Sequence, residues 1–171
     1  MQTKIKEALT ESLRDFRMPR YDQLPEIGLY LDQTVTLINE YLSPLQESAL
    51  TASMVSNYVK KGLISRPEGK RYSREQIAYL IFIALAKNVL SLDDLSRFIR
   101  VQQRSYPVPR AYDYLCEELE NLLAYVFGLK ETVDNVGVDS TVEKMMLRNT
   151  IIAAAHKIYL DKYFAMLPRD L

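Results

Sequence analysis

The sequence predicts a mainly α-helical protein with a small β wing and a C-terminal helical region. Over most of the chain, apolar residues recur at steps of three and four, which is the period of an amphipathic helix. Between residues 62 and 72 this period is interrupted, and glycine, proline and basic residues gather there. The chain has 171 residues, of which 48% are hydrophobic and 26% charged, so it has enough apolar side chains for a helical core.

The N-terminal segment predicts an amphipathic helix that ends before Pro19, because a proline disfavours helix in the residue before it. Its apolar positions follow the helical period: Ile5, Leu9, Leu13 and Phe16. This helix could dock on the body of the protein or pair with a second chain. Residues 20–30 contain proline and glycine, but also too many large apolar residues for a solvated linker, so we expect an ordered connector.

Two helices of different length are expected next. The first spans residues 32–42 and ends at Ser43-Pro44. The second begins at the N-cap Thr51 and ends where Gly62 provides a left-handed C-cap with Leu63 as its hydrophobic contact. Its inward face is predicted to be Met54, Val55, Tyr58 and Val59.

The segment after Gly62 predicts a short hairpin or a looser wing, because the turn sequence Pro67-Glu68-Gly69-Lys70 is flanked by short extended stretches. Ser73 and Gln76 then have the spacing of a capping box and open a strongly apolar helix. Ser91 and Asp94 show a similar signature before the next helix.

The two prolines within residues 105–110 mark the best candidate boundary in the chain. We therefore divide it into an N-terminal helix and connector (1–20), a DNA-binding unit (21–105) and a helical region for dimerisation or sensing (106–171). Beyond the boundary we expect one helix that Gly128 ends and a final helix over about 140–167.

The final helix has two apolar stripes and so needs cover on two sides. Leu147, Ile151, Ala154 and Ile158 form one stripe. The other follows a heptad-like spacing and is the candidate seam of a homodimer: Val142, Met145, Ile152, Tyr159, Tyr163 and Met166.

Charge is unevenly distributed, although the 22 basic and 22 acidic residues cancel. Residues 51–75 carry six basic and two acidic side chains, and 76–111 carry five and two. A local positive surface of this kind neutralises phosphates and releases counterions, so double-stranded DNA is the expected partner.

Two groups of side chains are the candidate DNA contacts. We expect the helix over residues 52–61 to enter the major groove, where side-chain amides and hydroxyls bond base edges. The candidates for base contact are Ser53, Ser56 and Asn57. The candidates for phosphate contact are Lys60, Lys61, Lys70, Arg71, Tyr72 and Arg74.

Three separated motifs carry a family resemblance: Leu24 to Gln33, Met54 to Ile64, and Lys70 to Leu80. Together they resemble the bacterial family catalogued as domain of unknown function eighteen thirty-six, over roughly residues 20–99. The arrangement of Tyr58, Gly62-Leu63 and Arg71-Tyr72-Ser73 is similar to the MerR-like winged helix-turn-helix. This resemblance implies that fold, and a role in transcription regulation.

Two departures from the MerR pattern bear on its DNA contacts. Ser56 stands where MerR proteins commonly carry an arginine. The connector 43–50 is longer than the ~3–4 residue turn of a simple helix-turn-helix.

Other site types have little support in the sequence. Cys116 lies among leucines and predicts a buried structural thiol, and His156 has no cysteine or carboxylate at ligand spacing, so we expect no metal and no cofactor. The chain lacks a glycine-rich phosphate loop and a nucleophile elbow, so we expect no enzyme.

The C-terminal tyrosines could form an aromatic and acidic pocket for a cationic ligand, although helical spacing explains most of them as core or interface residues. The residues concerned are Tyr112, Tyr114, Tyr125, Tyr159 and Tyr163, with Glu117 and Glu120.

The expected function is a cytoplasmic DNA-binding transcriptional regulator that acts as a homodimer, with an unknown small-molecule effector as a further partner and no membrane association. The alternative is a protein-interaction or assembly module that keeps the winged-helix shape. The position of the charges distinguishes the two. Convergence of Lys60, Lys70, Arg71 and Arg74 with Asn57 on one exposed face favours DNA, whereas cover by the N-terminal helix or a partner subunit favours the interaction module.

Overall fold

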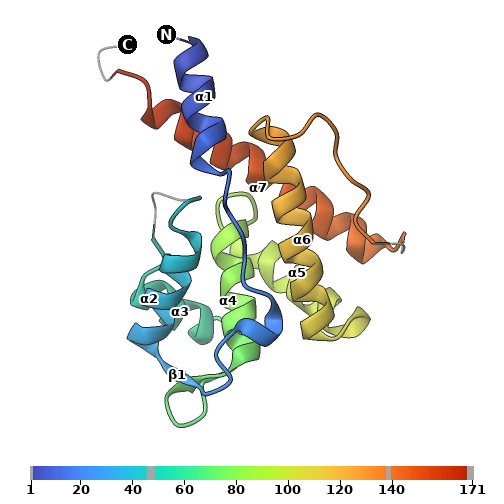
Figure 1. Cartoon of the computed structure of the whole chain (residues 1–171). Helices are drawn as coiled ribbons and strands as arrows, with labels where there is room; N and C mark the ends of the chain where they lie inside the picture. Colours follow the sequence, from blue (N-terminus) through green and yellow to red (C-terminus); the bar gives the residue numbers. More distant parts are fainter. Residues whose placement is uncertain (1, 46–48, 138–139, 169–171) are drawn as a thin grey trace.

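The computed structural model describes residues 2–45, 49–137 and 140–168. Within them the chain is mainly helical, with one small antiparallel sheet of two strands (Figure 1). The helices are α1 (Gln2–Ser12), a 3-10 turn η1 (Tyr21–Gln23), α2 (Leu31–Leu42), α3 (Ala52–Lys60), α4 (Arg74–Ala86), α5 (Leu92–Ser105), α6 (Val108–Val126) and α7 (Val142–Ala165). The strands are β1 (Leu29–Tyr30) and β2 (Arg71–Tyr72).

The central element is α4, which has neighbours on almost every side. Ten of its thirteen residues are buried, and it packs against α2, α6 and α7. The predicted capping box is confirmed: the Ser73 hydroxyl accepts a bond from the Gln76 amide, and the Gln76 side chain accepts one from the Ser73 amide. A continuous apolar run behind a strong N-cap therefore gives a helix that can only lie inside the core.

One continuous core joins the two regions on either side of residues 105–110. It runs from Leu9 in α1 to Ile158 in α7. The prolines do not form a linker, since α5 ends at Ser105 and α6 begins at Val108 with Pro107 as its N-cap. Proline suits the first turn of a helix, where its missing N–H is not needed. The division of the chain into units stays a prediction, but the described core crosses the expected boundary.

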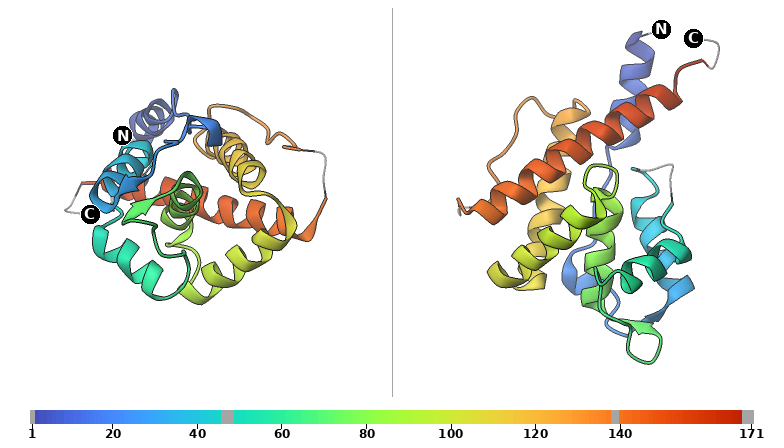
Figure 2. Two further views of the ribbon diagram at one scale, coloured as in Figure 1. Left: turned by 90° about the horizontal axis from the view of Figure 1, so that it is seen from below. Right: turned by 180° about the vertical axis from the view of Figure 1, so that it is seen from behind.

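The first helix docks on the body of the protein. α1 packs against α7, and the Thr10 hydroxyl donates a hydrogen bond of 2.7 Å to the Phe127 carbonyl at the end of α6. Both lie at the opposite end of the molecule from β1 and β2 (Figures 1 and 2). Of the two alternatives for this helix, the described chain realises the intramolecular one.

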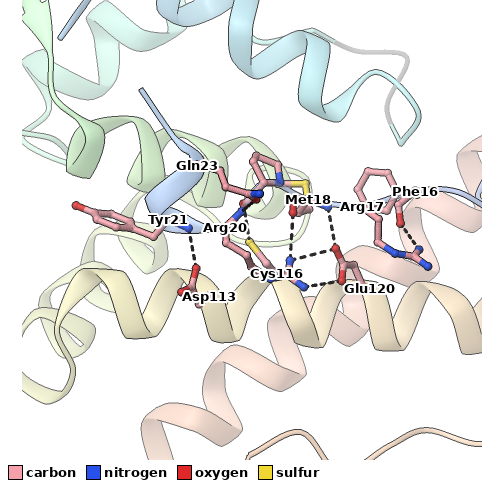
Figure 3. A network of polar contacts seen from close by, with 10 residues as sticks. Phe16, Arg17, Met18, Arg20, Tyr21, Gln23, Asp113, Cys116 and Glu120 are labelled. Atoms are coloured by element: carbon pink, nitrogen blue, oxygen red, sulfur yellow. Dashed lines mark hydrogen bonds and ion pairs between the residues drawn. The ribbon is translucent and has the colours of Figure 1, made fainter. Parts of the chain in front are cut away.

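The connector after α1 is ordered, as expected, because it is bonded along one face of α6 (Figure 3). The Arg20 guanidinium donates two bonds to the Glu120 carboxylate, at 3.1 and 2.8 Å, and the Met18 amide donates a third at 2.8 Å. Two turns earlier on α6, Asp113 accepts a bond from the Tyr21 amide at 2.7 Å. These bonds span about a hundred residues of sequence and fix the path of the connector towards β1.

The sheet differs from the expected wing. The sequence predicts a hairpin with both arms inside residues 64–72, but β2 pairs with β1 from the connector, with Leu29 opposite Tyr72 and Tyr30 opposite Arg71. Only an isolated bridge between Glu68 and Arg71 closes the expected hairpin. The pairing needs a small residue beside it, since a Cβ on Gly28 would lie 3.0 Å from the Arg71 Cβ.

One of the two apolar stripes predicted on α7 is buried, whereas the residues of the other are partly exposed and partly half-buried. Leu147, Ile151, Ala154 and Ile158 are buried, as expected. Of the dimer-seam candidates, Val142, Met145 and Met166 are exposed, whereas Ile152, Tyr159 and Tyr163 are half-buried against the core. The six therefore do not share one exposed stripe. The outward apolar residues of this helix also include Leu160 and Phe164, which the heptad assignment missed.

None of the described helices is long and apolar enough to cross a membrane.

Arg20→Ala is expected to lower the free energy of unfolding by about 2 kcal/mol, because it leaves the mostly buried Glu120 carboxylate without its charged partner. Arg17→Ala is the matched control, since Arg17 is exposed and its side chain bonds only the adjacent Phe16 carbonyl. Urea unfolding of both variants measures the difference. Equal stabilities would show that the ion pair does not hold the connector.

Candidate nucleic-acid interface

A cleft of about 840 Å³ lies between the start of α2, the exposed side of α3 and the turn that leads into β2. Its basic residues are Lys60, Arg66 and Lys70. The remaining lining residues are Tyr30, Leu31, Asp32, Ser56, Val59, Pro67 and Tyr72. Three cations and one carboxylate thus face a single surface hollow.

α3 is placed by its inner face and by its two caps. Val55 and Tyr58 are buried, and the Thr51 hydroxyl accepts a bond from the Met54 amide. At the other end, the Gly62 amide bonds the Val59 carbonyl and the Leu63 amide bonds the Tyr58 carbonyl. This is a Schellman motif, and Gly62 has the positive φ of 75° that it requires. Both predicted caps of this helix are confirmed.

The outward face of α3 carries the predicted base-contact residues. Ser53, Ser56 and Lys60 are exposed, and Asn57 is half-buried beside them. Spacings of three and four place these four side chains on one side of the helix. Lys61 is exposed at the C-cap, outside the cleft lining.

The turn before β2 presents Lys70 at its tip. Gly69 and Lys70 both have positive φ, 54° and 62°, and the Arg71 amide bonds the Glu68 carbonyl. Two consecutive positive φ values are the signature of a type I′ turn, whose twist matches that of paired strands. Lys70 is exposed, so the turn holds an ammonium group away from the body of the protein.

Arg71 is held beside the cleft by Tyr30, which is not among the predicted contact residues. Its guanidinium lies 4.8 Å from the ring centre of Tyr30 and donates a hydrogen bond of 3.2 Å to the Tyr30 hydroxyl. The two residues are strand neighbours that lie 41 positions apart in the chain. Such a long-range pair leaves no local spacing signal. Arg66, in contrast, is one of the six basic residues within 51–75, so its charge is evident from the sequence.

Two of the predicted phosphate contacts, Arg74 and Tyr72, are partly or fully buried and contribute to the fold. Arg74 is half-buried, donates a bond of 3.0 Å to the Leu24 carbonyl and lies over the ring of Tyr21. Tyr72 is only 4% exposed. Arg74 thus ties α4 to the connector, and Tyr72 forms a wall of the cleft.

The long connector between α2 and α3 is anchored by Asn39. Its side-chain amide donates to the Leu50 carbonyl at 2.9 Å, and its side-chain oxygen accepts from the Leu50 amide at 2.8 Å. These bonds reproduce a backbone pair and fix the chain one residue before the Thr51 cap. A connector of this length can therefore still place α3 at a defined angle to α2.

Cys116 and His156 lie outside the lining of the cleft. Cys116 is buried, as predicted, and its thiol lies 3.5 Å from the Pro19 carbonyl. Burial raises the pKa of this thiol to about 12, although Tyr112 and Arg20 act in the opposite direction. His156 is exposed on α7. Among the described residues, no three histidine, cysteine or carboxylate side chains are grouped as metal ligands.

The C-terminal tyrosines do not gather into one aromatic and acidic pocket. Tyr125 is exposed, whereas Tyr159 packs edge-on against Phe127 and stacks on Tyr163. Of the five, Tyr114 shares a cavity with Glu117, and Tyr106 lines the same cavity. Core and surface positions thus account for most of these residues.

Comparison with known proteins gives one match. A family model described as a domain of unknown function (DUF1836) matches residues 19–115, which include the connector, the cleft and the first turns of α6. Searches of curated proteins and of solved structures found no match.

Asn39→Asp is expected to lower the free energy of unfolding by about 2 kcal/mol, because a carboxylate cannot donate to the Leu50 carbonyl and would repel it. Thr36→Ala, at an exposed position of the same helix, is the control. Chemical denaturation of both variants measures the difference. Equal stabilities of Asn39→Asp and Thr36→Ala would show that Asn39 does not anchor the connector.

The Cys116 thiol is expected to resist alkylation by iodoacetamide at pH 8, where the folded protein holds it protonated and buried. Its pKa is raised on folding, so the protonated thiol favours the folded state below the unfolded pKa of about 9, and this contribution is lost as the pH rises towards 12. Mass spectrometry of native and urea-unfolded protein gives the rates. Equal rates in the two states would contradict the assignment.

Proposed function

The chain belongs to the DUF1836 family, and we propose that it is a DNA-binding transcriptional regulator with a MerR-like winged helix-turn-helix. In this proposal α2 and α3 form the helix-turn-helix, and the turn with β2 forms the wing. α3 enters the major groove, and the wing lies along the phosphate backbone.

The observation that carries the proposal is the cleft, which brings Ser56 and Lys60 from the polar face of α3 together with two further cations. Lys60, Arg66 and Lys70 line it together with Ser56. Ammonium and guanidinium groups on such a surface neutralise phosphates, and the small polar side chains on α3 leave room for base edges. Asn57 is the residue best suited to pair with an adenine edge.

The position of α1 supports the same proposal. Cover of the basic face by the N-terminal helix would favour a protein-interaction module. α1 instead packs on α7 at the far end of the molecule (Figures 1 and 2). Of the residues expected on one exposed face, Lys60, Lys70 and Arg71 are exposed, whereas Asn57 is half-buried and Arg74 is half-buried with its guanidinium bonded to the Leu24 carbonyl.

Arg71 is suited to a phosphate contact by its neighbour. The Tyr30 ring and hydroxyl already restrict its guanidinium, so less side-chain entropy remains to be lost on binding. A second guanidinium edge can still meet the DNA backbone, since Arg71 is exposed.

A homodimer is part of the proposal, since two copies double the phosphate contacts and match a palindromic site. The outward residues of α7 support it: Val142 is 77% exposed and Phe164 is 64% exposed. Exposed apolar side chains along one helix offer a surface that a second copy of the chain would cover.

The second candidate function is a protein-interaction module on the same scaffold. Ile27 supports it, because this side chain is 73% exposed just before β1, and Tyr30 is exposed beside it. An apolar side chain there contributes nothing to phosphate binding but would anchor a protein partner.

Lys70→Ala combined with Arg71→Ala is expected to weaken binding to all duplex sequences by about tenfold or more at low salt. It should also reduce the slope of log affinity against log salt by about 0.9 for each phosphate contact removed. Fluorescence anisotropy with genomic fragments, including the region upstream of its own gene, measures both quantities.

The matched control is Lys4→Ala combined with Lys6→Ala, which removes the same charge from exposed positions of α1. An unchanged salt slope in the wing variant would contradict the wing assignment. Absence of any affinity of the native protein for duplex DNA at low salt would refute the proposed function and leave the interaction module.

A further inference from the structure

Two adjoining cavities lie where α4, α5, α6 and α7 meet, on a part of the protein that the proposed DNA surface does not use. They share four lining residues: Phe98, Gln102, Ala111 and Leu147. The inner cavity has a volume of about 40 Å³ and the outer one about 340 Å³. The outer volume lies within the range of ligand pockets, which is ~300–1,000 Å³.

The inner cavity is an apolar recess. Its walls include Phe82 from α4, Ile99 from α5 and Leu115 from α6. The side-chain amide of Gln102 is occupied elsewhere, since it accepts a bond from the Tyr79 hydroxyl and donates one to the Tyr106 carbonyl, both at 2.8 Å. The recess therefore offers contact to hydrocarbon.

The size of the recess limits what it can hold. A single water needs ~10–15 Å³ on this measure, and a cavity that binds benzene is ~150 Å³. A volume of about 40 Å³ thus suits the branched methyl groups of a short aliphatic chain, and excludes an aromatic ring without movement of the walls.

The outer cavity carries charges of both signs. Its basic residues are Arg110 and Lys144, and its acidic residues are Asp113, Glu117 and Glu143. Asp113 already accepts the Tyr21 amide of the connector. Glu117 and Glu143 take part in no ion pair among the described residues. Two carboxylates are therefore available to a ligand.

Lys144 is held over an aromatic ring. Its ammonium lies 5.3 Å from the ring centre of Tyr114, whose hydroxyl donates to the buried Glu118. An ammonium that lies on a ring face still has N–H groups on its other side, and these can donate hydrogen bonds to an anion. The outer cavity thus combines the Lys144 ammonium and Arg110 with the carboxylates of Glu117 and Glu143, and it adjoins an apolar recess.

From this arrangement we propose that the paired cavity binds a free aliphatic α-amino acid of about the size of leucine. Its branched methyl groups lie in the recess beside Ala111 and Leu147. Its carboxylate bonds the Lys144 ammonium, and its own ammonium lies between Glu117 and Glu143. The proposal does not depend on DNA binding, and its experiment contains no nucleic acid.

Isothermal titration calorimetry of the full chain with L-leucine tests it, alongside 4-methylpentanoate, 3-methylbutylamine and L-phenylalanine. L-leucine should bind, and each of the other three should bind at least about tenfold more weakly, because each loses one charge-assisted bond or fails to fit the recess. The Ala111 and Leu147 methyl signals should shift in NMR spectra on addition of L-leucine.

Two variants locate the site. Lys144→Gln should weaken L-leucine binding about tenfold, whereas Lys130→Gln, which changes a lysine outside both cavities, should leave it unchanged. Ala111→Leu should abolish binding by filling the shared wall. If Ala111→Leu fails to fold, the comparison of Lys144→Gln with Lys130→Gln still tests the site.

Several outcomes would overturn the proposal. The absence of binding heat with L-leucine at about 10 mM would do so, because a dissociation constant above that concentration is too weak for a specific site. If 4-methylpentanoate or 3-methylbutylamine bound as tightly as L-leucine, the site would not recognise both charged groups of an amino acid. If L-phenylalanine bound as tightly, the side chain would not lie in the small recess. An undiminished affinity of Lys144→Gln would place the ligand elsewhere.

Discussion

The bonds between Arg20 and Glu120 are the constraint on which the arrangement of this protein depends. They fix the connector on α6, and the connector supplies β1, which pairs with β2 and forms the base of the turn that carries Lys70. The hydrogen bonds that Arg20 donates to this carboxylate raise the pKa of the guanidinium above its ordinary value. The cleft is thus oriented by a contact made at the other side of the core.

α4 provides the second link between the two ends of the molecule. Its N-terminus follows β2 directly, and its buried face supplies Ala78 and Phe82 to the inner cavity beside α6. A packed helix moves as a unit because its neighbours leave no free volume for local adjustment. One packed helix therefore connects the wall of the inner cavity with the turn before β2.

Local chemistry made much of the fold predictable. The caps at Thr51, Ser73 and Gly62 need only residues within one helical turn, so their spacing in the sequence was sufficient. The burial of α4 followed from its uninterrupted apolar run. In the candidate site, the same local signals placed the outward face of α3 and the tip of the turn.

What could not be predicted depends on contacts between distant segments. Nothing near Arg71 indicates that its strand partner is Tyr30, and nothing near Arg74 indicates that its guanidinium turns inward to the Leu24 carbonyl. The seam predicted on α7 is divided for a related reason. Tyr159 and Tyr163 are half-buried because they pack against the core, with the Tyr159 ring edge-on to Phe127 at the end of α6.

The burial of α4 also has a dynamic consequence. This helix cannot detach from the core without exposing ten buried residues, so its backbone amides open to solvent only when the whole protein unfolds. The turn around Lys70 is exposed and lies outside this core. The molecule therefore combines a buried central helix with an exposed turn, and a change in the turn need not disturb the packing of the helix.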